Sequence, residues 1–481
     1  MPYTSLRRSL LALALLPVMT GATATPAGAV SPGGDTGVRD ASGGSTSAQT
    51  EQTLAVDPTN PANVAIGFIS GLSISHDGGM TWKLSGLTCT GDNNPAFDEG
   101  GTALFECDNN GPGVFRSQDA GDHWGSPVTA VSGSDNNGDI ADRPWLVRGA
   151  GKGKVYLGYE SFFTTPIGWV FVKGSSDAGA SWPGPAHRVD DAASTNIYPA
   201  AQDPREMPAV GGDGTLYLAY ASGHQPFTVP DFLPTTIVVA RSHDGGATFD
   251  RSAAAPNISR TNAPEEETEA ISWLAADPSP LRGNHVALAW ADKRSGESRV
   301  LVVSSIDGGI TWSKHVDVAD DAPGTGNSHD HAVLSFGPDG RLFAVWRDRR
   351  CCGGGWNSNY EIFARAFTLG ATGVTPAGGS VRVTDSPQSP NPVSNLNEYI
   401  GAVAGAEGLS VAWNQQRNGT AGATFRRLPL STVVPLVRGE RAAQSSMLPV
   451  TGRTASAAGI LAALGVALMV LLATALAKLR P

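Results

Sequence analysis

Charged and aromatic side chains recur in the middle of the chain wherever a short apolar segment begins. These positions hold acids, arginines, histidines and a tyrosine: Glu51, Asp142, Arg143, Arg205, Glu206, Glu269, His329, Asp330, His331, Glu398 and Tyr399. Paired carboxylates are the groups that act as acid and base in glycoside cleavage. Arginine offers a two-pronged donor for a carboxylate on a ligand. If the segments converge at one end of a fold, these residues predict a cavity that binds a polar ligand.

A second charged pattern, W-x-[DQ]-x-R, ends three of the apolar segments. It stands at Trp290-Asp292-Arg294, Trp346-Asp348-Arg350 and Trp413-Gln415-Arg417. One interpretation places Arg350 at the ligand as an anion-binding group. The other is a repeated structural device in which aspartate and arginine pair between neighbouring repeats, and we favour it for the motif as a whole.

Metal-ligand patterns are weak. The run 329–331 offers two imidazoles and a carboxylate, but a hydrogen-bonded cluster explains it better than a metal site does. Residues 135–139 resemble a calcium loop without the downstream bidentate glutamate. No Cys–His spacing predicts zinc. We therefore predict no cofactor and no metal, with calcium as the open alternative.

The four cysteines are too few for a disulfide scaffold. Cys89 and Cys107 stand 18 residues apart in a turn-rich stretch and are predicted to pair in an oxidising compartment. Cys351 and Cys352 are adjacent. They form either a vicinal disulfide or two thiols.

The segments that carry the charges have the pattern of β-hairpins. Two apolar runs flank a glycine-bearing turn in residues 145–159, 209–220, 334–346 and 402–413. Such units begin near Glu51, Asn93, Asp142, Arg205, Glu269, His329 and Glu398. Seven units over residues 51–430 leave about 54 residues each, room for four strands, and no amphipathic helix separates them. An all-β, seven-bladed β-propeller is predicted, with a segment before Glu51 completing the last blade.

An eight-residue pattern, S-x-D-x-G-x-[ST]-[WF], recurs at 75–82, 117–124, 175–182, 242–249 and 305–312, with its seventh position relaxed in the second copy. Its aspartate accepts backbone N–H groups within a turn, its glycine takes a positive φ, and its aromatic ring packs between sheets. The aspartates are therefore predicted to be structural rather than catalytic: Asp77, Asp119, Asp177, Asp244 and Asp307.

The pattern resembles the Asp box, or BNR repeat, of the sialidase superfamily. Enzymes of that family cleave terminal sialic acid with three arginines, a Tyr–Glu nucleophile pair and an aspartate acid/base. Carried onto this chain, the resemblance implies catalytic roles for Glu398, Tyr399 and Asp330. It implies that Arg143, Arg205 and Arg350 bind the substrate carboxylate. Glu206, Glu51 and His329 are predicted to bind substrate because each opens an inner strand and faces the same pocket.

The chain departs from that family in two respects. The F/Y-R-I-P motif of bacterial sialidases is absent, and residues 51–54 read Glu-Gln-Thr-Leu in its place. Seven blades also differ from the six of sialidases, so a six-bladed ring is the alternative. Two functions remain open: an exo-α-sialidase-like glycoside hydrolase, or a non-catalytic glycan- or protein-binding propeller that acts as an adhesin or receptor.

The net charge limits the classes of molecule that the protein is expected to bind. The 481 residues carry 34 basic and 44 acidic side chains, a formal net charge of −10. Nucleic acid is therefore not expected as a partner, and glycans or glycoconjugates are.

The first 29 residues are typical of a secretory signal peptide. Arg7 and Arg8 precede a short apolar run, and small residues at 27–29 suit cleavage, as do those at 22–24. The run is too short to span a bilayer. Residues 30–50 then read as a flexible leader. We therefore expect secretion.

The end of the chain resembles a Gram-positive cell-wall sorting signal. A polar spacer (431–447) leads to LPVTG (448–452), an uncharged apolar segment (455–477) and a basic tail (478–481). The resemblance implies that a sortase cuts between Thr451 and Gly452 and joins Thr451 to peptidoglycan. The apolar segment is long enough to hold the chain in the membrane before sorting. Permanent membrane anchoring is the alternative.

Overall fold

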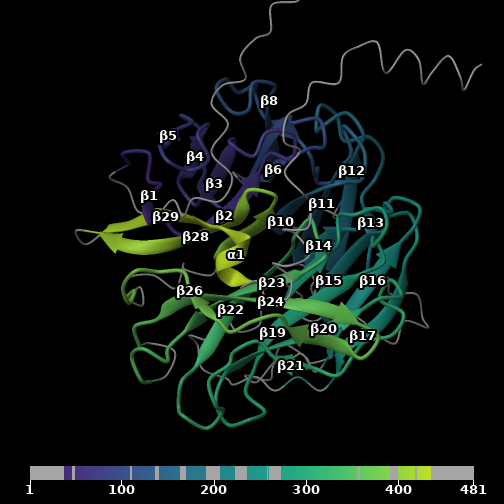
Figure 1. Ribbon diagram of the computed structural model, residues 1–481. Helices are drawn as coiled ribbons and strands as arrows, with labels where there is room; N and C mark the ends of the chain where they lie inside the picture. The colour runs from purple at the N-terminus through teal and green to yellow at the C-terminus, as the bar shows by residue number, and fades with distance from the viewer. Residues whose placement is uncertain are drawn as a thin grey trace, which may run out of the picture. The chain divides into compact units, whose positions relative to one another are not determined.

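The computed structural model describes residues 37–45, 49–108, 111–135, 140–162, 169–190, 206–222, 236–256, 258, 272–354, 358–389, 399–417 and 420–434. The described chain is almost entirely β-strand, with one four-residue helix, α1 (Leu430–Val433). Its strands form seven antiparallel sheets that follow one another along the chain (Figure 1). The protein is a seven-bladed β-propeller, as the spacing of the hairpins predicts.

Each blade is a meander in which successive strands are neighbours. Blade 1 holds β2 (Thr53–Val56), β3 (Val64–Phe68), β4 (Gly71–Ser75) and β5 (Lys83–Leu84). Blade 2 holds β6 (Asn93–Phe97), β7 (Ala103–Asp108), β8 (Pro112–Ser117) and β9 (Val128–Thr129). Blade 3 holds β10 (Ile140–Arg148), β11 (Val155–Phe162), β12 (Trp169–Ser175) and β13 (His187–Arg188).

The later blades repeat this order. Blade 4 holds β14 (Met207–Val210), β15 (Leu216–Ser222), β16 (Thr236–Ser242) and β17 (Asp250–Pro256). Blade 5 holds β18 (Trp273–Ala276), β19 (Val286–Asp292), β20 (Arg299–Ser305) and β21 (Val316–Asp317). Blade 6 holds β22 (His329–Phe336), β23 (Leu342–Asp348), β24 (Glu361–Gly370), β25 (Gly373–Pro376) and β26 (Val381–Arg382).

Blade 7 closes the ring with strands from both ends of the described chain. It holds β27 (Gly401–Gly405), β28 (Gly408–Arg417), β29 (Thr420–Leu428) and, as its outermost strand, β1 (Arg39–Asp40). Arg39 pairs with Phe425 and Asp40 with Thr424. The hypothesis that a segment before Glu51 completes the last blade is confirmed.

Blade 6 differs from the expected four strands. The sequence also predicts a strand at 381–385, and β26 confirms it, but a further short strand, β25, shares the edge of β24. β25 pairs with its end, 367–370, and β26 pairs with Phe363 and Ala364. The extra hairpin arises because β24 runs several residues beyond the blade before it turns back.

Apolar side chains fill the spaces between the blades. Seven hydrophobic clusters are described, one between each pair of neighbours, including the pair of blades 7 and 1. Both faces of the middle strands are therefore covered. This is why β19 and β23 are buried along their whole length and why their sequences do not alternate between apolar and polar residues.

The Asp box forms the turn between the third and fourth strands in the first five blades, as predicted. In the first box, Asp77 Oδ1 accepts the Thr81 N–H at 2.9 Å and its Oδ2 accepts the Thr81 hydroxyl at 2.6 Å. The ring of Trp82 packs edge-on against Phe425 of blade 7, with 5.2 Å between ring centroids. The box thus ties each turn together and anchors it to the preceding blade.

All four cysteines form disulfides. Cys89 pairs with Cys107 as expected, and Cys351 pairs with its neighbour Cys352, which settles the alternative left open by the sequence. No helix within the described residues is long and apolar enough to cross a membrane. The predicted signal peptide, the sorting motif with Thr451 and Gly452, and the apolar segment 455–477 lie outside the described residues.

Candidate functional site

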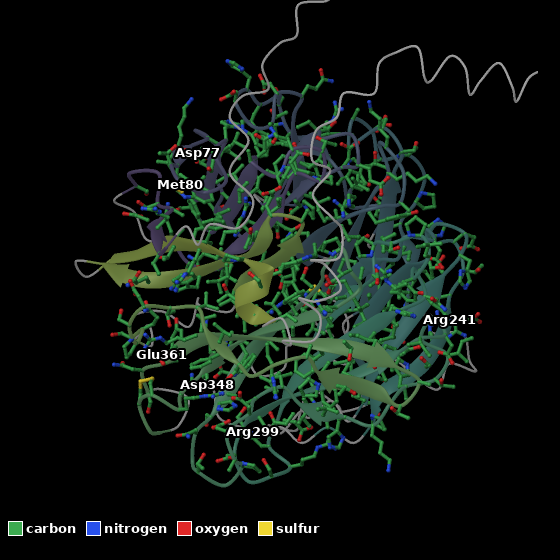
Figure 2. All side chains as sticks on the ribbon, viewed as in Figure 1. Asp77, Met80, Arg241, Arg299, Asp348 and Glu361 are labelled. Atoms are coloured by element: carbon green, nitrogen blue, oxygen red, sulfur yellow. A yellow bond between two sulfur atoms is a disulfide. The ribbon has the colours of Figure 1, made fainter. Side chains whose placement is uncertain are left out.

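The two ends of the propeller differ in chemistry. We call the end at which inner strands begin and second strands end the site face, and the opposite end, which carries the Asp boxes, the Asp-box face. The alternating strand directions put the described residues among those singled out by sequence, such as Asp142, Asp330 and Asp348, on the site face. Among them, Asp348 of blade 6 lies on the same side of the ring as Arg299 of blade 5 (Figure 2).

A β-bulge places Arg143 at the start of blade 3. Asp142 pairs with Glu160 of β11, whereas Trp145 pairs with Gly158, so β10 holds one extra residue. Arg143 takes up this extra length with a positive φ of 51°. Non-glycine residues adopt that conformation only when the surrounding structure enforces it, and such bulges often redirect a side chain at a functional site.

Arg143 joins a pair of glutamates from two blades. Its Nε lies 3.1 Å from Oε1 of Glu160, which is almost completely buried, and 4.0 Å from Oδ2 of Asp142. Glu206, just before β14 in blade 4, is also buried, and neither of its carboxylate oxygens has a hydrogen-bond partner. Three charged groups thus meet where blades 3 and 4 adjoin on the site face.

The two glutamates have different environments. Burial raises the pKa of Glu206 well above its ordinary value, and the nearby Glu160 carboxylate raises it further, against the opposing effect of Arg143. Glu160 is the glutamate that forms the direct ion pair with the guanidinium, which stabilises its ionised form. In such a pair, the glutamate with the raised pKa, Glu206, can donate a proton, and its partner Glu160 remains a carboxylate.

Blade 6 repeats the bulge of blade 3 with different residues. Asp330 pairs with Arg347 and Val333 with Val345, and His331 takes the positive φ, 52°. The Asp330 carboxylate accepts from Arg349 Nη1 at 2.6 Å and contacts His331 Nδ1 at 2.7 Å. Burial raises the pKa of Asp330, but Arg349 and His331 outweigh it and hold this pKa far below its ordinary value, so Asp330 stays ionised and is a weak base. Its catalytic role stays a prediction.

Arg350 is engaged by carboxylates of its own surroundings. Its Nη2 lies 2.8 Å from Oδ2 of Asp348, its Nη1 lies 2.7 Å from Oδ1 of Asp320, and its guanidinium lies over the Phe363 ring. In blade 5, Asp292 binds Arg294 in the same way. In W-x-D-x-R the arginine therefore pairs chiefly with the aspartate two residues before it in the same motif, rather than with a neighbouring blade. Arg350 additionally binds Asp320, in the connection before its blade.

Three aromatic rings meet near the propeller axis. Trp145 of blade 3 contacts Trp273 of blade 5 and Tyr399 of blade 7, with ring centroids 5.3 Å and 5.5 Å apart. Tyr399 is buried. Because Trp145 and Arg143 belong to the same strand, β10, Tyr399, the predicted nucleophile, lies next to the strand that carries Arg143. This arrangement is consistent with Tyr399 and Arg143 serving one site.

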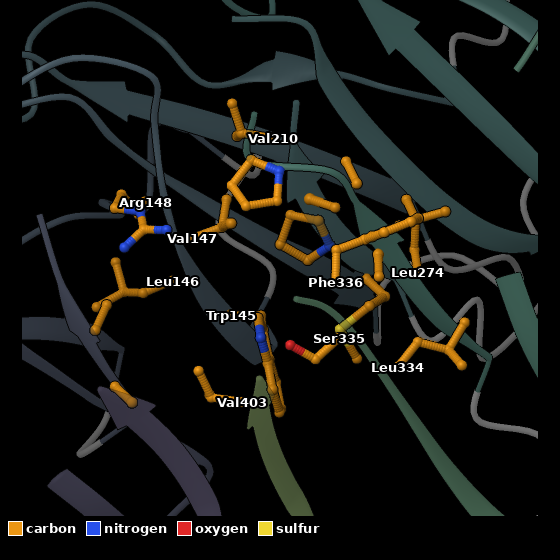
Figure 3. A pocket seen from close by; sticks show the side chains of 18 of the residues that line it. Trp145, Leu146, Val147, Arg148, Val210, Leu274, Leu334, Ser335, Phe336 and Val403 are labelled. Carbon is orange, nitrogen blue, oxygen red and sulfur yellow. The ribbon is translucent and has the colours of Figure 1, made fainter. Parts of the chain in front are cut away.

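A cavity of about 280 Å³ follows the axis and is walled by inner strands of all seven blades. Most of its lining residues have apolar side chains, with Glu99, Arg148 and Ser335 among the polar ones, and Trp145 stands beside Val403 and Ser335 (Figure 3). None of the described residues predicted for the site lines it. The cavity includes the ends of the inner strands, such as Val56 and Phe336, and so extends toward the Asp-box face.

The remaining predicted residues divide into two groups. Glu51 is buried with a positive φ of 59° before blade 1, and His329 is buried at the start of β22. Arg205, Glu269 and Glu398 lie outside the described residues, so their roles stay predictions.

Asp135 of the calcium-like run accepts from Lys173 Nζ at 2.9 Å and from the Ala186 N–H at 3.1 Å, whereas 136–139 are not described.

Sequence reasoning missed Glu160 and Glu106. Both are acids near the end of an apolar second strand, but neither stands at the position of the aspartate in W-x-D-x-R. Counted from the residue opposite the Asp-box serine, Glu106 is three residues on, Glu160 five and Asp292 six. No repeated sequence pattern therefore marks these two glutamates. Glu106 is buried without a hydrogen-bond partner for either carboxylate oxygen, and burial, with Asp108 and Asp92 nearby, raises its pKa well above the ordinary value.

The fold and the charged site face define a class: seven-bladed propellers with Asp-box turns. No known family model matches the chain, and no curated protein sequence matches it. Solved structures that resemble it include a protein of unknown function from Dyadobacter fermentans, with 14% identity over 82% of this chain and 99% of that one, at a TM-score of 0.45.

Two further solved structures are glycan-acting enzymes by their names. A Hadza microbial sialidase has 14% identity over 77% of this chain and 74% of its own, at a TM-score of 0.43. The Penicillium chrysogenum α-L-arabinanase has 17% identity over 56% of this chain and 74% of its own, at a TM-score of 0.36. At these identities and scores the likeness says nothing of the reaction of this chain.

Proposed function

We propose that this protein is a glycan-acting hydrolase whose acid and base lie where blades 3 and 4 meet on the site face. The observation that carries the proposal is the buried pair Glu206 and Glu160 beside Arg143. Two carboxyl groups with opposed environments are the minimum equipment for cleaving a glycosidic bond.

The roles follow from the environments of the two groups. Glu206 keeps its proton to higher pH than an ordinary glutamate and donates it to the departing glycosidic oxygen. Glu160, ionised beside Arg143, acts on the sugar carbon as a nucleophile or on a water molecule as a base. Arg143 also supplies N–H groups for an acidic sugar.

The finer form of the proposal is an exo-acting sialidase-type enzyme. It needs more than one arginine at the substrate carboxylate. Arg143 lies at the site, Arg350 is occupied by Asp348 and Asp320, and Arg205 precedes Glu206 directly in sequence. The sialidase form therefore depends on Arg205, with Tyr399 as nucleophile.

A non-catalytic glycan- or protein-binding propeller is the second candidate. Two observations favour it. The ion pairs Asp330–Arg349, Asp348–Arg350 and Asp292–Arg294 satisfy many of the charges on the site face. Glu160 and Glu206 are also nearly completely buried, which limits direct access by a sugar.

A panel of fluorogenic glycosides, including a sialoside, separates the candidates. Wild type and the variants Arg205→Ala and Glu206→Gln are incubated with each substrate. Release that both substitutions abolish supports the sialidase form, and release that only Glu206→Gln abolishes supports a hydrolase for another sugar. No release from any glycoside, together with glycan-array binding that Arg143→Ala removes, supports the binder.

We further propose that the protein is displayed on a Gram-positive cell wall, on the basis of the LPVTG motif, the apolar segment and the basic tail. Thr451→Ala should leave the chain in the membrane fraction because the sortase loses the residue it joins to peptidoglycan. Immunoblots of fractions released by a muralytic enzyme test this. Absence of the wild-type chain from the wall fraction contradicts the proposal.

A further inference from the structure

A buried histidine at the junction of blades 5 and 6 points between two carboxylates. The side chain of His329 is 0% exposed, and its Nε2 lies 3.4 Å from Oδ2 of Asp321 and 3.4 Å from Oδ1 of Asp348. Neither ring nitrogen makes a hydrogen bond, and Oδ2 of Asp321 makes none either. The three donor atoms lie within 4.8 Å of one another.

Both separations are long for hydrogen bonds, which centre near 2.9–3.0 Å for N–H···O, about 0.4 Å shorter. They match the distance between two ligands of one metal ion. Zinc binds imidazole nitrogen and carboxylate oxygen at about 2.0–2.2 Å, and two such ligands in a tetrahedron lie about 3.3–3.5 Å apart.

The surrounding groups orient these carboxylates. The other oxygen of Asp321, Oδ1, accepts from Arg299 Nη2 at 2.9 Å. Asp348 receives the Trp346 Nε1–H at 2.9 Å on Oδ2, where Arg350 also donates. Asp321 is thus held through one oxygen and turns the other toward His329, whereas Asp348 Oδ1, which faces His329, also accepts the backbone N–H of Arg350 at 2.9 Å. Partners of this kind, behind the ligands, are usual in metal sites.

The charge around His329 is unbalanced. Among the described residues, five carboxylates gather there, and two guanidiniums, those of Arg299 and Arg350, face them. The acids are Glu297, Asp317, Asp320, Asp321 and Asp348. With a neutral imidazole, the group carries three excess negative charges in a largely buried place. A divalent cation removes most of that excess.

We propose that Asp321, His329 and Asp348 bind one divalent transition-metal ion of the Zn²⁺ class. One imidazole nitrogen and two carboxylate oxygens fill three positions of a tetrahedron and leave the fourth for water. The ion joins the connection between β21 and β22, which carries Asp321, to the paired strands β22 and β23. It thereby fastens blade 5 to blade 6.

The test uses the full chain, purified under non-reducing conditions, stripped with EDTA and supplied with ZnCl₂. We expect one zinc per chain by elemental analysis after removal of free metal, and a higher thermal unfolding temperature than in the stripped protein. Bound Co²⁺ should give the visible absorption of a tetrahedral site. His329→Gln and Asp321→Asn should lose the metal and both effects.

His331→Gln is the matched control. His331 lies two residues from His329 and is also buried, but it contacts Asp330 and not the proposed ligands. It should retain one zinc. Asp321 is partly exposed, so Asp321→Asn decides the question if His329→Gln fails to fold. The proposal is overturned if the wild type binds no stoichiometric zinc, or if Asp321→Asn binds it as the wild type does. A protonated imidazole then bridges the two aspartates.

Discussion

Glu106 and Glu206 are buried on the site face, and their carboxylate oxygens have no hydrogen-bond partner in the described structure, which is costly for folding. A buried carboxyl group without partners loses its hydration whether or not it is charged, and the ionised form loses most. Such a group is retained where its proton is used or where it stabilises a ligand. Glu206 stands beside Glu160 and Arg143, whereas Glu106 has only acids for charged neighbours in the described structure.

Glu106→Gln should raise the free energy of unfolding at pH 8 by about 1 kcal/mol or more and leave it nearly unchanged at pH 4. Burial first, then Asp108 and Asp92, raise the pKa of Glu106 above its ordinary 4.5 in the folded state. The folded protein therefore binds the extra proton above pH 4.5, and stability falls as pH rises toward the raised pKa. Urea unfolding at both pH values measures this. An equal effect at pH 4 and pH 8 contradicts it.

Sequence could predict the roles of some residues better than others. The Asp-box aspartates were predictable because their partners lie within four residues. Arg143 and Glu206 were predictable as residues of the site face because they begin inner strands. Glu160 was not, since its importance depends on a neighbour from another strand, and the engagement of Arg350 by Asp320 depends on a connection 30 residues away.

At the scale of elements, each Asp box has two residues with left-handed backbone: the glycine that the pattern requires and the residue before it, for which the pattern requires no particular amino acid. The residue after the aspartate has a positive φ in all five boxes, 76° at Gly78 and 75° at Gly245, but also 57° at Ala120 and 54° at Ala178. Alanine is strained there because its Cβ approaches the backbone.

Exchange of alanine and glycine at this position should change stability in opposite directions. Ala120→Gly should stabilise the protein by up to about 1 kcal/mol, and Gly245→Ala should destabilise it by about 1 kcal/mol. At Gly245 the added Cβ meets only the Tyr156 hydroxyl, at 3.5 Å, so the cost comes from the backbone alone. Denaturant midpoints measure both. A loss of stability in Ala120→Gly would show that the box tolerates alanine without strain.

The two disulfides should differ in their effect on stability. Cys89→Ala with Cys107→Ala opens a loop of 18 residues and should cost about 3 kcal/mol, because the unfolded chain regains freedom. Cys351→Ala with Cys352→Ala is the control, since the pair is adjacent and closes almost no loop. Unfolding of both double variants under non-reducing conditions tests this. Equal losses contradict the account.

At the scale of the molecule, the ring is closed by non-covalent contacts between distant parts of the chain. Gln49 is fully buried and its Oε1 accepts the N–H of Ala423 at 2.9 Å, while its carbonyl oxygen lies 3.4 Å from Nδ2 of Asn414. β1 adds the outer edge of the same blade. The ring is therefore closed by Gln49 and β1, which belong to the segment 30–50 whose composition predicts a flexible leader.

Gln49→Ala should destabilise the whole propeller by about 1–3 kcal/mol because a buried N–H of Ala423 loses its partner. Cooperative unfolding should shift as one transition, since every blade packs on two neighbours. Urea unfolding followed by tryptophan fluorescence measures the shift. An unchanged midpoint would show that the N-terminal segment does not hold the ring closed.

The number of blades was predictable because each hairpin repeats the same short-range pattern. The extra strand of blade 6, β25, was not, because its four residues are too few to show a strand pattern, whereas β26 lies within the strand predicted at 381–385. The site face was predictable as a surface, since strand direction alternates within a blade. Which of its charges are paired across blades was not.

The pH dependence of kcat/KM for wild type and Glu206→Gln tests the central claim most directly, with Glu99→Gln, a glutamate in the first turn of blade 2, as control. For a glycoside that the screen shows to be cleaved, the wild-type rate should fall at alkaline pH as Glu206 loses its proton. Glu206→Gln should lose this alkaline fall and about 10²-fold or more of the rate, least with leaving groups that need no proton. A Glu206→Gln profile that matches wild type in height and shape contradicts the assignment of the site.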